Sequence, residues 1–435
     1  MVLPPDCRKY CSPTVSVAPM HRLRAVSLPA LDRNGQIVFV ARTLRSFAFG
    51  LNSVALGLYL AGIGLDAGQI GLVLSAALAG TLGLTLVIAL YGDRIGRRRL
   101  LMAGSALMVA AGLVPVLGNE PLLLAALALS GMVAVNANES TGLQTVDQAL
   151  LPQAVPAQQL TAAFALYNVL ASVAAALGAL AIGLFPLIGD MLGLHGANVY
   201  LPAFVLYALI GVACLVIQSR LDARAETGER VARTLAIDRS RGIVARLSIL
   251  FSLDSFAGSF TVQSFIAYFF ATAFGADPLA VGSLLFAANL LSAVSFPVAA
   301  WLSRRFGLIN TMVFTHIPSS LFLFGVALSP SFAIAAPLWL ARAALASMDV
   351  PARQSYTMAV VEPAERTAAA GVTSLARAIA LVPGPAIAGA LLVPLGLGVP
   401  LIATGVLKIV YDVSLFALFR THPAPEERLR REQPK

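Results

Sequence analysis

Apolar runs of about 20 residues recur along the whole chain and are separated by short polar segments. In a helix, a run of this length crosses the hydrocarbon core of a bilayer, which is about 30 Å thick. Because lipid offers no partner for backbone N–H and C=O groups, each run is predicted to be a helix. The twelve predicted spans lie at residues 37–61, 68–91, 100–117, 121–145, 158–183, 199–219, 246–271, 278–302, 308–329, 332–349, 366–393 and 398–420.

The composition also indicates a membrane protein rather than a soluble one. Of the 435 residues, 58% are hydrophobic and 12% are charged, whereas soluble domains carry about 25% charged residues. The mean hydropathy of the chain is +0.83. The predicted fold class is therefore an all-α polytopic membrane protein.

The sequence gives little support to an enzyme or to a cofactor site. The three cysteines are too few for a disulfide framework. The four histidines form no HExxH zinc motif, and the chain has no phosphate-binding P-loop. We therefore predict no enzyme activity, no metal, no cofactor and no ATP-driven transport.

The basic residues of the chain gather in alternate loops. Of the 30 lysines and arginines, 25 lie in the two tails or in loops on one side of the predicted spans, and the other five lie inside spans. By the positive-inside rule, both termini are predicted to be cytoplasmic. This orientation, with contact to anionic lipid headgroups, explains the net charge of +9 better than nucleic-acid binding does.

The second half of the sequence repeats the first. Gly71 aligns with Gly282 and Gly96 with Gly307, each at a displacement of 211 residues, and a Ser-Phe-Ala segment recurs after 209. Two homologous six-helix halves are typical of transporters that rock one half against the other. The predicted organisation is an N-terminal tail at 1–35, a first bundle at 36–219, a linker at 220–245, a second bundle at 246–420 and a C-terminal tail at 421–435.

The loop after the second predicted span reads GDRIGRRR, from Gly92 to Arg99. With the six-plus-six repeat, it resembles the major facilitator superfamily, whose loop at this place is usually written GxLxDRxGRR. Ala89 and Tyr91 depart from that pattern, and in the second half Arg304 stands where the acid would be. The matching residues are Asp93, Arg94, Gly96, Arg97 and Arg98.

The resemblance implies that these five matching residues form part of a conformational gate. In the family, the acid of this loop, here Asp93, docks on the start of the eleventh span and closes the cytoplasmic side. A helix start suits an acid because its free N–H groups and its dipole are positive. The alternative is that Gly92 and Gly96 only form a turn and that the arginines face water and headgroups.

Arg42 and Arg45 lie inside the first span and Asp254 lies inside the seventh. An ionisable residue at the membrane centre costs at least about 2.5–3.5 kcal/mol, so each is a functional candidate. The repeat aligns Arg45 with Asp254 at a displacement of 209 residues. Two interpretations stay open: an ion pair between the halves, or separate partners or snorkelling within each half.

The end of the fourth span is unusually polar. In a continuous helix, Asn136, Ser140 and Gln144 would share one face, with Glu139 beside it. A carboxyl desolvated there would have a raised pKa, which suits proton coupling. Glu139 is the first candidate for a proton carrier, ahead of Asp254, and structural packing is the alternative.

Two features of the last spans resemble drug exporters of the superfamily but lie in the other half. Arg342 in the tenth span resembles a buried arginine that those exporters carry in the fourth span. Gly384, Pro385 and Gly389 resemble the glycine-proline motif of their fifth span, although close helix packing or a kink is the preferred interpretation. Arg342 and Arg377, near the middle of the eleventh span, are candidate cavity-lining residues together with Asn136, Ser140 and Gln144.

Lys408 and Asp412 are four residues apart and are predicted to pair along their own helix. If Asp147, two residues beyond the fourth span, is counted with Glu139, Asp254, Asp349 and Asp412, five acids balance the five bases inside spans. That balance indicates internal pairing rather than an anionic substrate.

The predicted function is secondary transport of a small molecule by alternating access. The resemblance favours proton-coupled efflux of drugs or metabolites by a monomer in the bacterial inner membrane. A proton-coupled importer of a small solute and a non-transporting sensor with the same fold are the alternatives.

Overall fold

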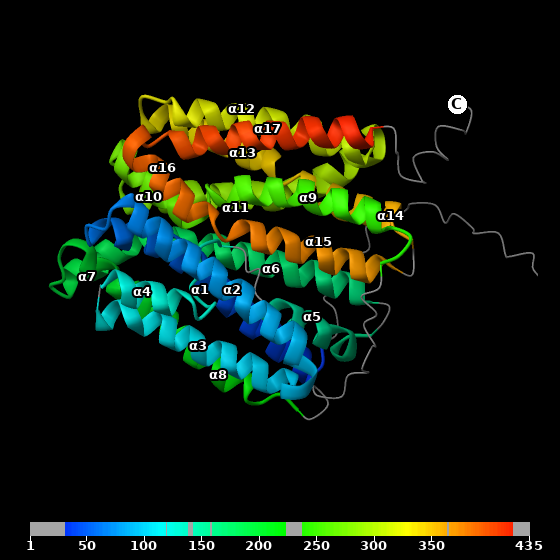
Figure 1. Cartoon of the computed structure of the whole chain (residues 1–435). Coiled ribbons are helices and arrows are strands. Elements are labelled where there is room, and N and C mark those ends of the chain that lie inside the picture. Colours follow the sequence, from blue (N-terminus) through cyan, green and yellow to red (C-terminus); the bar gives the residue numbers. More distant parts are fainter. Residues whose placement is uncertain are drawn as a thin grey trace, which may run out of the picture.

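The computed structural model describes residues 31–118, 120–137, 142–156, 159–222, 237–362 and 365–420, which form helices and their connections and contain no strand. In Figure 1 the first half of the chain lies below the second. The first half contains α1 (Arg33–Gly62), α2 (Ala67–Ile95), α3 (Arg97–Leu117), α4 (Pro121–Ala128), α5 (Gly142–Ala154), α6 (Leu160–Ala181), α7 (Phe185–Met191) and α8 (Leu201–Gln218). The second contains α9 (Arg241–Ser259), α10 (Gln263–Phe274), α11 (Pro278–Phe306), α12 (Leu308–Ala327), α13 (Phe332–Ala346), α14 (Asp349–Val360), α15 (Arg366–Leu381), α16 (Gly384–Leu395) and α17 (Val399–Phe419).

Eleven stretches of the described residues are long and apolar enough to cross a membrane. The predicted span at 121–145 is not among them, because α4 and α5 are separate helices and residues 129–137 between them are not helical. Gly131 has a φ of +76° in this break, a conformation that favours glycine. The fold is thus the predicted all-α bundle, although its fourth span is not one helix.

Three further spans bend where one helix ends and the next begins: α9 into α10, α13 into α14, and α15 into α16. The bend between α15 and α16 falls at Pro383 and Pro385, which lack the N–H that would continue the helix. The tenth span reaches Val360 rather than ending at residue 349 as predicted. Its extension places Arg353 inside a span instead of in a loop.

The repeat between the halves is visible in matching caps and turns. The side chain of Asp66 accepts from the backbone N–H of Gln69 and starts α2, and Asp277 accepts from Ala280 N–H at 2.8 Å and starts α11. Gly96, with φ +94°, separates α2 from α3, and Gly307, with φ +93°, separates α11 from α12.

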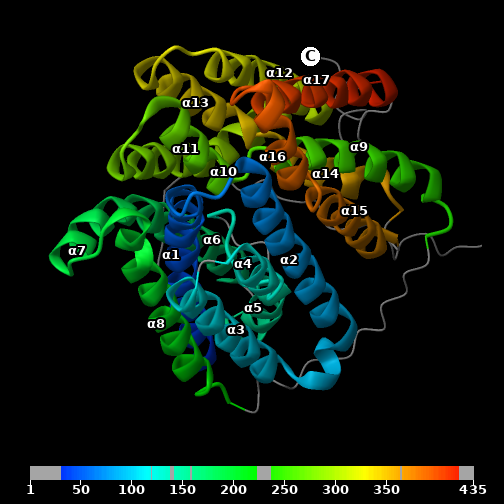
Figure 2. The same ribbon diagram turned by 60° about the vertical axis from the view of Figure 1, so that its left-hand side comes forward.

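The two halves meet at the end of the bundle that holds the loops 63–66, 275–277 and 396–398, which we call the contact end. There α1 packs on α10, α2 on α16, and α6 on α11, and Figure 2 shows α2 meeting α16. A Cβ on Gly71 of α2 would lie 2.3 Å from the Pro385 carbonyl oxygen of α16. The start of α1 and the end of α17 lie at the opposite end, which we call the termini end.

Candidate functional site

The first half contains a buried ion pair between Arg45 of α1 and Asp147 of α5. Both side chains are essentially inaccessible to solvent. The Tyr167 hydroxyl of α6 donates to the same carboxylate at 3.2 Å, and the guanidinium of Arg42 lies 5.2 Å from the centre of the Tyr167 ring. These contacts join three spans of the first half.

The second half contains a larger buried charge cluster, centred on Asp254 of α9. Lys408 of α17 donates to Asp254 Oδ1 at 2.6 Å, and Arg353 of α14 donates to Asp254 Oδ2 at 3.1 Å. Arg353 also donates to Asp349 at 2.8 Å. One carboxylate therefore connects two cations from two other spans.

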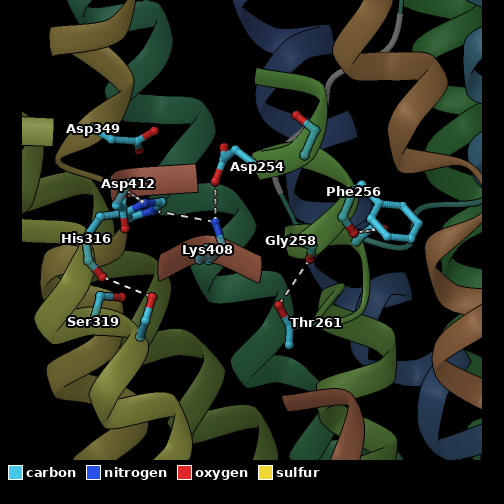
Figure 3. Close-up of polar contacts among 12 residues, drawn as sticks. Asp254, Phe256, Gly258, Thr261, His316, Ser319, Asp349, Lys408 and Asp412 are labelled. Atoms are coloured by element: carbon cyan, nitrogen blue, oxygen red, sulfur yellow. Dashed lines mark hydrogen bonds and ion pairs between the residues drawn. The ribbon is translucent and has the colours of Figure 1, made fainter. Parts of the chain in front are cut away.

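The same cluster continues to His316 of α12 and Asp412 of α17. The distance from His316 Nδ1 to Asp412 Oδ1 is 3.1 Å, and Lys408 Nζ lies 3.5 Å from His316 Nε2. Figure 3 shows Lys408 between Asp254 and His316. All six side chains of this C-half cluster are buried: Asp254, His316, Asp349, Arg353, Lys408 and Asp412.

The two halves carry equivalent ion pairs with their charges reversed. The repeat aligns Arg45 with Asp254 (254 − 45 = 209) and Asp147 with Arg353 (353 − 147 = 206). Arg45–Asp147 and Asp254–Arg353 thus join corresponding spans. Two interpretations were open for Arg45 and Asp254. The structure shows separate partners and no ion pair between the two residues, because each pairs within its own half.

The predicted pair between Lys408 and Asp412 is also wrong. Although they lie one turn apart on α17, Lys408 reaches Asp254 on α9, and Asp412 faces His316 on α12. A spacing of four residues allows a contact between two side chains on one helix. Here both side chains bond instead to charged or polar groups on neighbouring helices.

The fourth span also differs from its prediction. Because residues 129–137 are not helical, Asn136 and Gln144 do not share a helix face. Asn136 Oδ1 instead accepts from the backbone N–H of Gln263 in the other half at 3.0 Å, and Gln144 is half-buried on α5. Glu139 and Ser140 lie outside the described residues.

The loop after α2 contacts its own half. Arg97 donates to the Ala149 carbonyl at 3.4 Å and Arg98 to the Ser219 carbonyl at 2.5 Å. Arg94 is exposed, and Gly96 makes the turn. The side chain of Asp93 lies outside the described residues, so its docking on the eleventh span stays a prediction.

The glycine-proline segment of span 11 lies where helices approach closely. A Cβ on Gly384 would lie 1.6 Å from the Ser259 hydroxyl oxygen of α9, and one on Gly389 would lie 2.1 Å from the Ala67 carbonyl oxygen of α2. Pro385 provides the carbonyl that faces Gly71. Such close approach is what small residues permit between membrane helices.

Sequence reasoning missed three members of these pairs. His316 belongs to no recognisable motif, Arg353 lies four residues beyond the predicted end of the tenth span, and Asp147 lies two residues beyond that of the fourth. The displacement of 206 residues, which also relates Gln148 to Gln354, links Asp147 to Arg353 and would have pointed to both.

We expect the ion pair between Arg45 and Asp147 to be restored only when the charges of both of its own members are exchanged. Arg45→Asp leaves two carboxylates facing each other, and breaking a buried pair costs about 3–5 kcal/mol. The double variant Arg45→Asp with Asp147→Arg should regain most of the lost thermal stability, measured by a melting curve of the purified protein. The matched double variant Arg45→Asp with Asp254→Arg should regain none. Equal rescue by both would contradict the assigned partners.

Glu365, just before α15, holds the start of α9. Its carboxylate accepts from the backbone N–H groups of Asp238, Arg239 and Ser240 at 2.8–3.0 Å. The Ser240 side chain and these N–H groups lower the pKa of Glu365 to about 2. The stabilisation is therefore complete above the ordinary glutamate pKa of about 4.3 and is lost only as the pH falls through about 2.

We expect Glu365→Gln to lose the hydrogen-exchange protection of the amides of residues 238–240, since a neutral amide oxygen is a weaker acceptor than a carboxylate. In the unmodified protein this protection should not change between about pH 5 and 8, once intrinsic exchange rates are corrected. Glu362→Gln is the control, because only the backbone N–H of Glu362 contacts this segment. Protection that survives in Glu365→Gln would refute the assigned role.

Comparisons with known proteins agree with this architecture. A model described as Major Facilitator Superfamily matches residues 38–253 and 247–435. An uncharacterized membrane protein of Saccharomyces cerevisiae is 25% identical over 428 residues, which cover 91% of this chain and 96% of that protein.

Two solved transporters share the fold. The nucleoside transporter NupG superposes with a TM-score of 0.70 and 12% identity, over 89% of this chain and 99% of that chain. A D-xylose-proton symporter superposes with a TM-score of 0.66 and 14% identity, over 88% and 97%. Identities this low show the fold and leave the substrate open. The family match spans both halves, and the chain belongs to the Major Facilitator Superfamily of membrane transporters.

Proposed function

We propose that this chain is a proton-coupled secondary transporter of a small molecule and that the C-half cluster carries the proton. The observation that supports this is the charge balance of the six buried side chains. Three carboxylates face two permanent cations and one histidine. The cluster has one negative charge in excess when His316 is neutral, and it becomes neutral when one proton binds.

The geometry suits a neutral His316 that receives this proton at Nε2. A neutral ring with its proton on Nδ1 donates to Asp412, while Nε2 accepts from Lys408. Protonation at Nε2 turns that acceptor into a donor, and two positive charges then lie 3.5 Å apart. Lys408 is thereby pushed from His316 toward Asp254, so the proton alters contacts among α9, α12 and α17.

The movement that follows is alternating access, in which the contact end opens as the termini end closes. We propose that the termini end is cytoplasmic, because the tails and the loops at that end carry most of the lysines and arginines. The loop residues Asp93, Arg94, Gly96, Arg97 and Arg98 would then form the cytoplasmic gate. Efflux, a monomeric state and a bacterial inner-membrane location remain predictions from the sequence.

A growth and uptake screen tests the proposed function. A host strain carrying the chain, or the Asp254→Asn variant as a matched control, is exposed to a panel of toxic compounds and labelled solutes, with and without an uncoupler. An uncoupler-sensitive change in the cellular level of a compound, absent in Asp254→Asn, is the expected result. A fall in that level indicates export and a rise indicates import. Transport that the uncoupler does not change would contradict proton coupling. Absence of transport for every compound would favour the sensor alternative.

A further inference from the structure

Two arginines lie deep in the second half without a carboxylate partner. Arg342 of α13 and Arg377 of α15 have no acidic oxygen within 4.0 Å among the residues that the structure describes. The guanidinium of Arg342 stacks on the ring of Trp339 at 4.5 Å, and Arg377 Nε donates to the Ser255 hydroxyl at 2.9 Å. Neither contact neutralises the charge.

Both arginines are near the middle of their spans. Arg342 follows the start of α13 by ten residues and Arg377 follows the start of α15 by eleven, or roughly 15 Å at about 1.5 Å per residue. A charge at this depth is expensive and faces the bundle interior or a polar cavity. Two cations without a direct carboxylate partner at this depth are therefore expected to have a function.

Neighbouring contacts connect both arginines to helices that meet the first half. Trp339, one turn before Arg342, packs against Phe270 of α10, and α10 contacts α1 of the other half. Ser255, which holds Arg377, adjoins Asp254 in the chain. The helix of Arg377, α15, packs on α9 and also contacts α2 of the other half.

The structure also corrects the charge count that had disfavoured an anionic substrate. Since span 10 runs to Val360, Arg353 is inside the membrane. The bases well inside the spans are then six, Arg42, Arg45, Arg342, Arg353, Arg377 and Lys408. The acids are four among the described residues, Asp147, Asp254, Asp349 and Asp412, with Glu139 as a fifth from the sequence prediction alone. Arg353 and Lys408 pair with the acids of the C-half cluster, which leaves the positive excess at Arg342 and Arg377.

We propose that the transported molecule is a small organic anion and that Arg342 and Arg377 bind its charged oxygens. The planar guanidinium group matches the geometry of carboxylate and phosphate oxygens. Trp339 holds Arg342 in position through the contact between its ring and the guanidinium group. The proposal rests on the proposed transport function, and it adds the chemical class of the substrate.

Binding to the purified full-length protein in detergent tests the proposal without a proton gradient. The probes are benzoate, succinate, citrate and glycerol 3-phosphate, with benzamide and glycerol as neutral counterparts and tetraphenylphosphonium as a cation. We expect at least one anion to raise the melting temperature of the protein, while its neutral counterpart does not. Comparison of the carboxylates with glycerol 3-phosphate shows whether the site prefers a carboxylate or a phosphate group.

The variants Arg342→Gln and Arg377→Gln should each raise the Kd of that anion by at least about tenfold, whereas Arg342→Lys and Arg377→Lys should keep part of the affinity. Arg305→Gln is the matched control, because Arg305 also stacks on a tryptophan, Trp301, but lies in the last turn of α11. Binding of only neutral or cationic probes, no binding by any anion, or full affinity in both glutamine variants would overturn the proposal. His316→Asn should retain anion binding, which separates this proposal from a failure of proton coupling.

Discussion

Replacement of His316 by asparagine is expected to remove the pH response of the second half and, with it, proton-driven transport. Asparagine keeps a polar group near Asp412 but cannot receive a proton, so the C-half cluster stays one proton short at every working pH. Substrate exchange without a gradient should persist, because the arginines proposed to bind the substrate are unchanged. The gradient-driven rate should fall about a hundredfold, near the lower end of what a positioned proton-transfer group contributes.

The chain offers a reporter that needs no known substrate. It contains two tryptophans, and Trp339 is buried on α13, the helix that carries Arg342, whereas Trp301 is half exposed on α11. In a Trp301→Phe background, Trp339 fluorescence should change with pH, because proton binding alters the contacts of the C-half cluster. His316→Asn should abolish that change.

His195→Asn is the matched control, since His195 is exposed in the loop before α8. It should leave the fluorescence response and the driven rate as they are. A pH response that persists in His316→Asn would refute the role of this histidine. If the response then disappeared in Asp412→Asn, the proton would be carried by the carboxyl alone.

The fold could be predicted from the sequence because its signals either lie within one segment or occur in both halves. Apolar length predicts each span, and the turn glycines Gly96 and Gly307 mark equivalent corners of the two halves. The repeat also identified Arg45 and Asp254 as equivalent positions. Two residues that the repeat aligns, however, occupy matching places in separate halves and need not be in contact.

The site was harder to predict because it depends on packing between helices. Lys408 could bond along its helix to Asp412 or across to Asp254, and the sequence spacing describes only the first option. The break in the fourth span was hidden because the polar residues at its end, such as Asn136 and Gln144, also fit one face of an unbroken helix. The late end of span 10, which moves Arg353 into the membrane, was hidden because polar residues usually mark loops.

Substitution of Gly71 by valine is expected to hold the contact end open. The carbonyl of Pro385 in the other half leaves no room for a Cβ at Gly71, and a backbone oxygen cannot rotate away as a side chain can. The two halves can relieve this clash by separating, because they pack as units that rock against each other. The closed state shown by the structure should therefore lose population to the state that is open at this end.

A cysteine at Ser75 reports the change, since Ser75 Oγ accepts from the Ala386 N–H of the other half at 2.9 Å. With the three native cysteines replaced by alanine, Ser75→Cys should react with a maleimide at least about tenfold faster in Gly71→Val, a shift of ~1.4 kcal/mol in the opening equilibrium. Gly83→Val is the control on the same helix, because a Cβ on Gly83 meets open space. Equal reactivity in both valine variants would refute closure at this contact.

Gly178→Val should behave differently, and the difference tests whether the halves are separate units. A Cβ on Gly178 of α6 would lie 2.0 Å from the Phe47 carbonyl oxygen of α1 in the same half. That clash cannot be relieved by rocking, so it should destabilise the first half by about 1–3 kcal/mol or more. The expected result is a lower melting temperature with no gain in Ser75→Cys reactivity. The opposite pattern, with Gly71→Val unfolding the protein and Gly178→Val opening it, would mean that the moving boundary lies inside the first half.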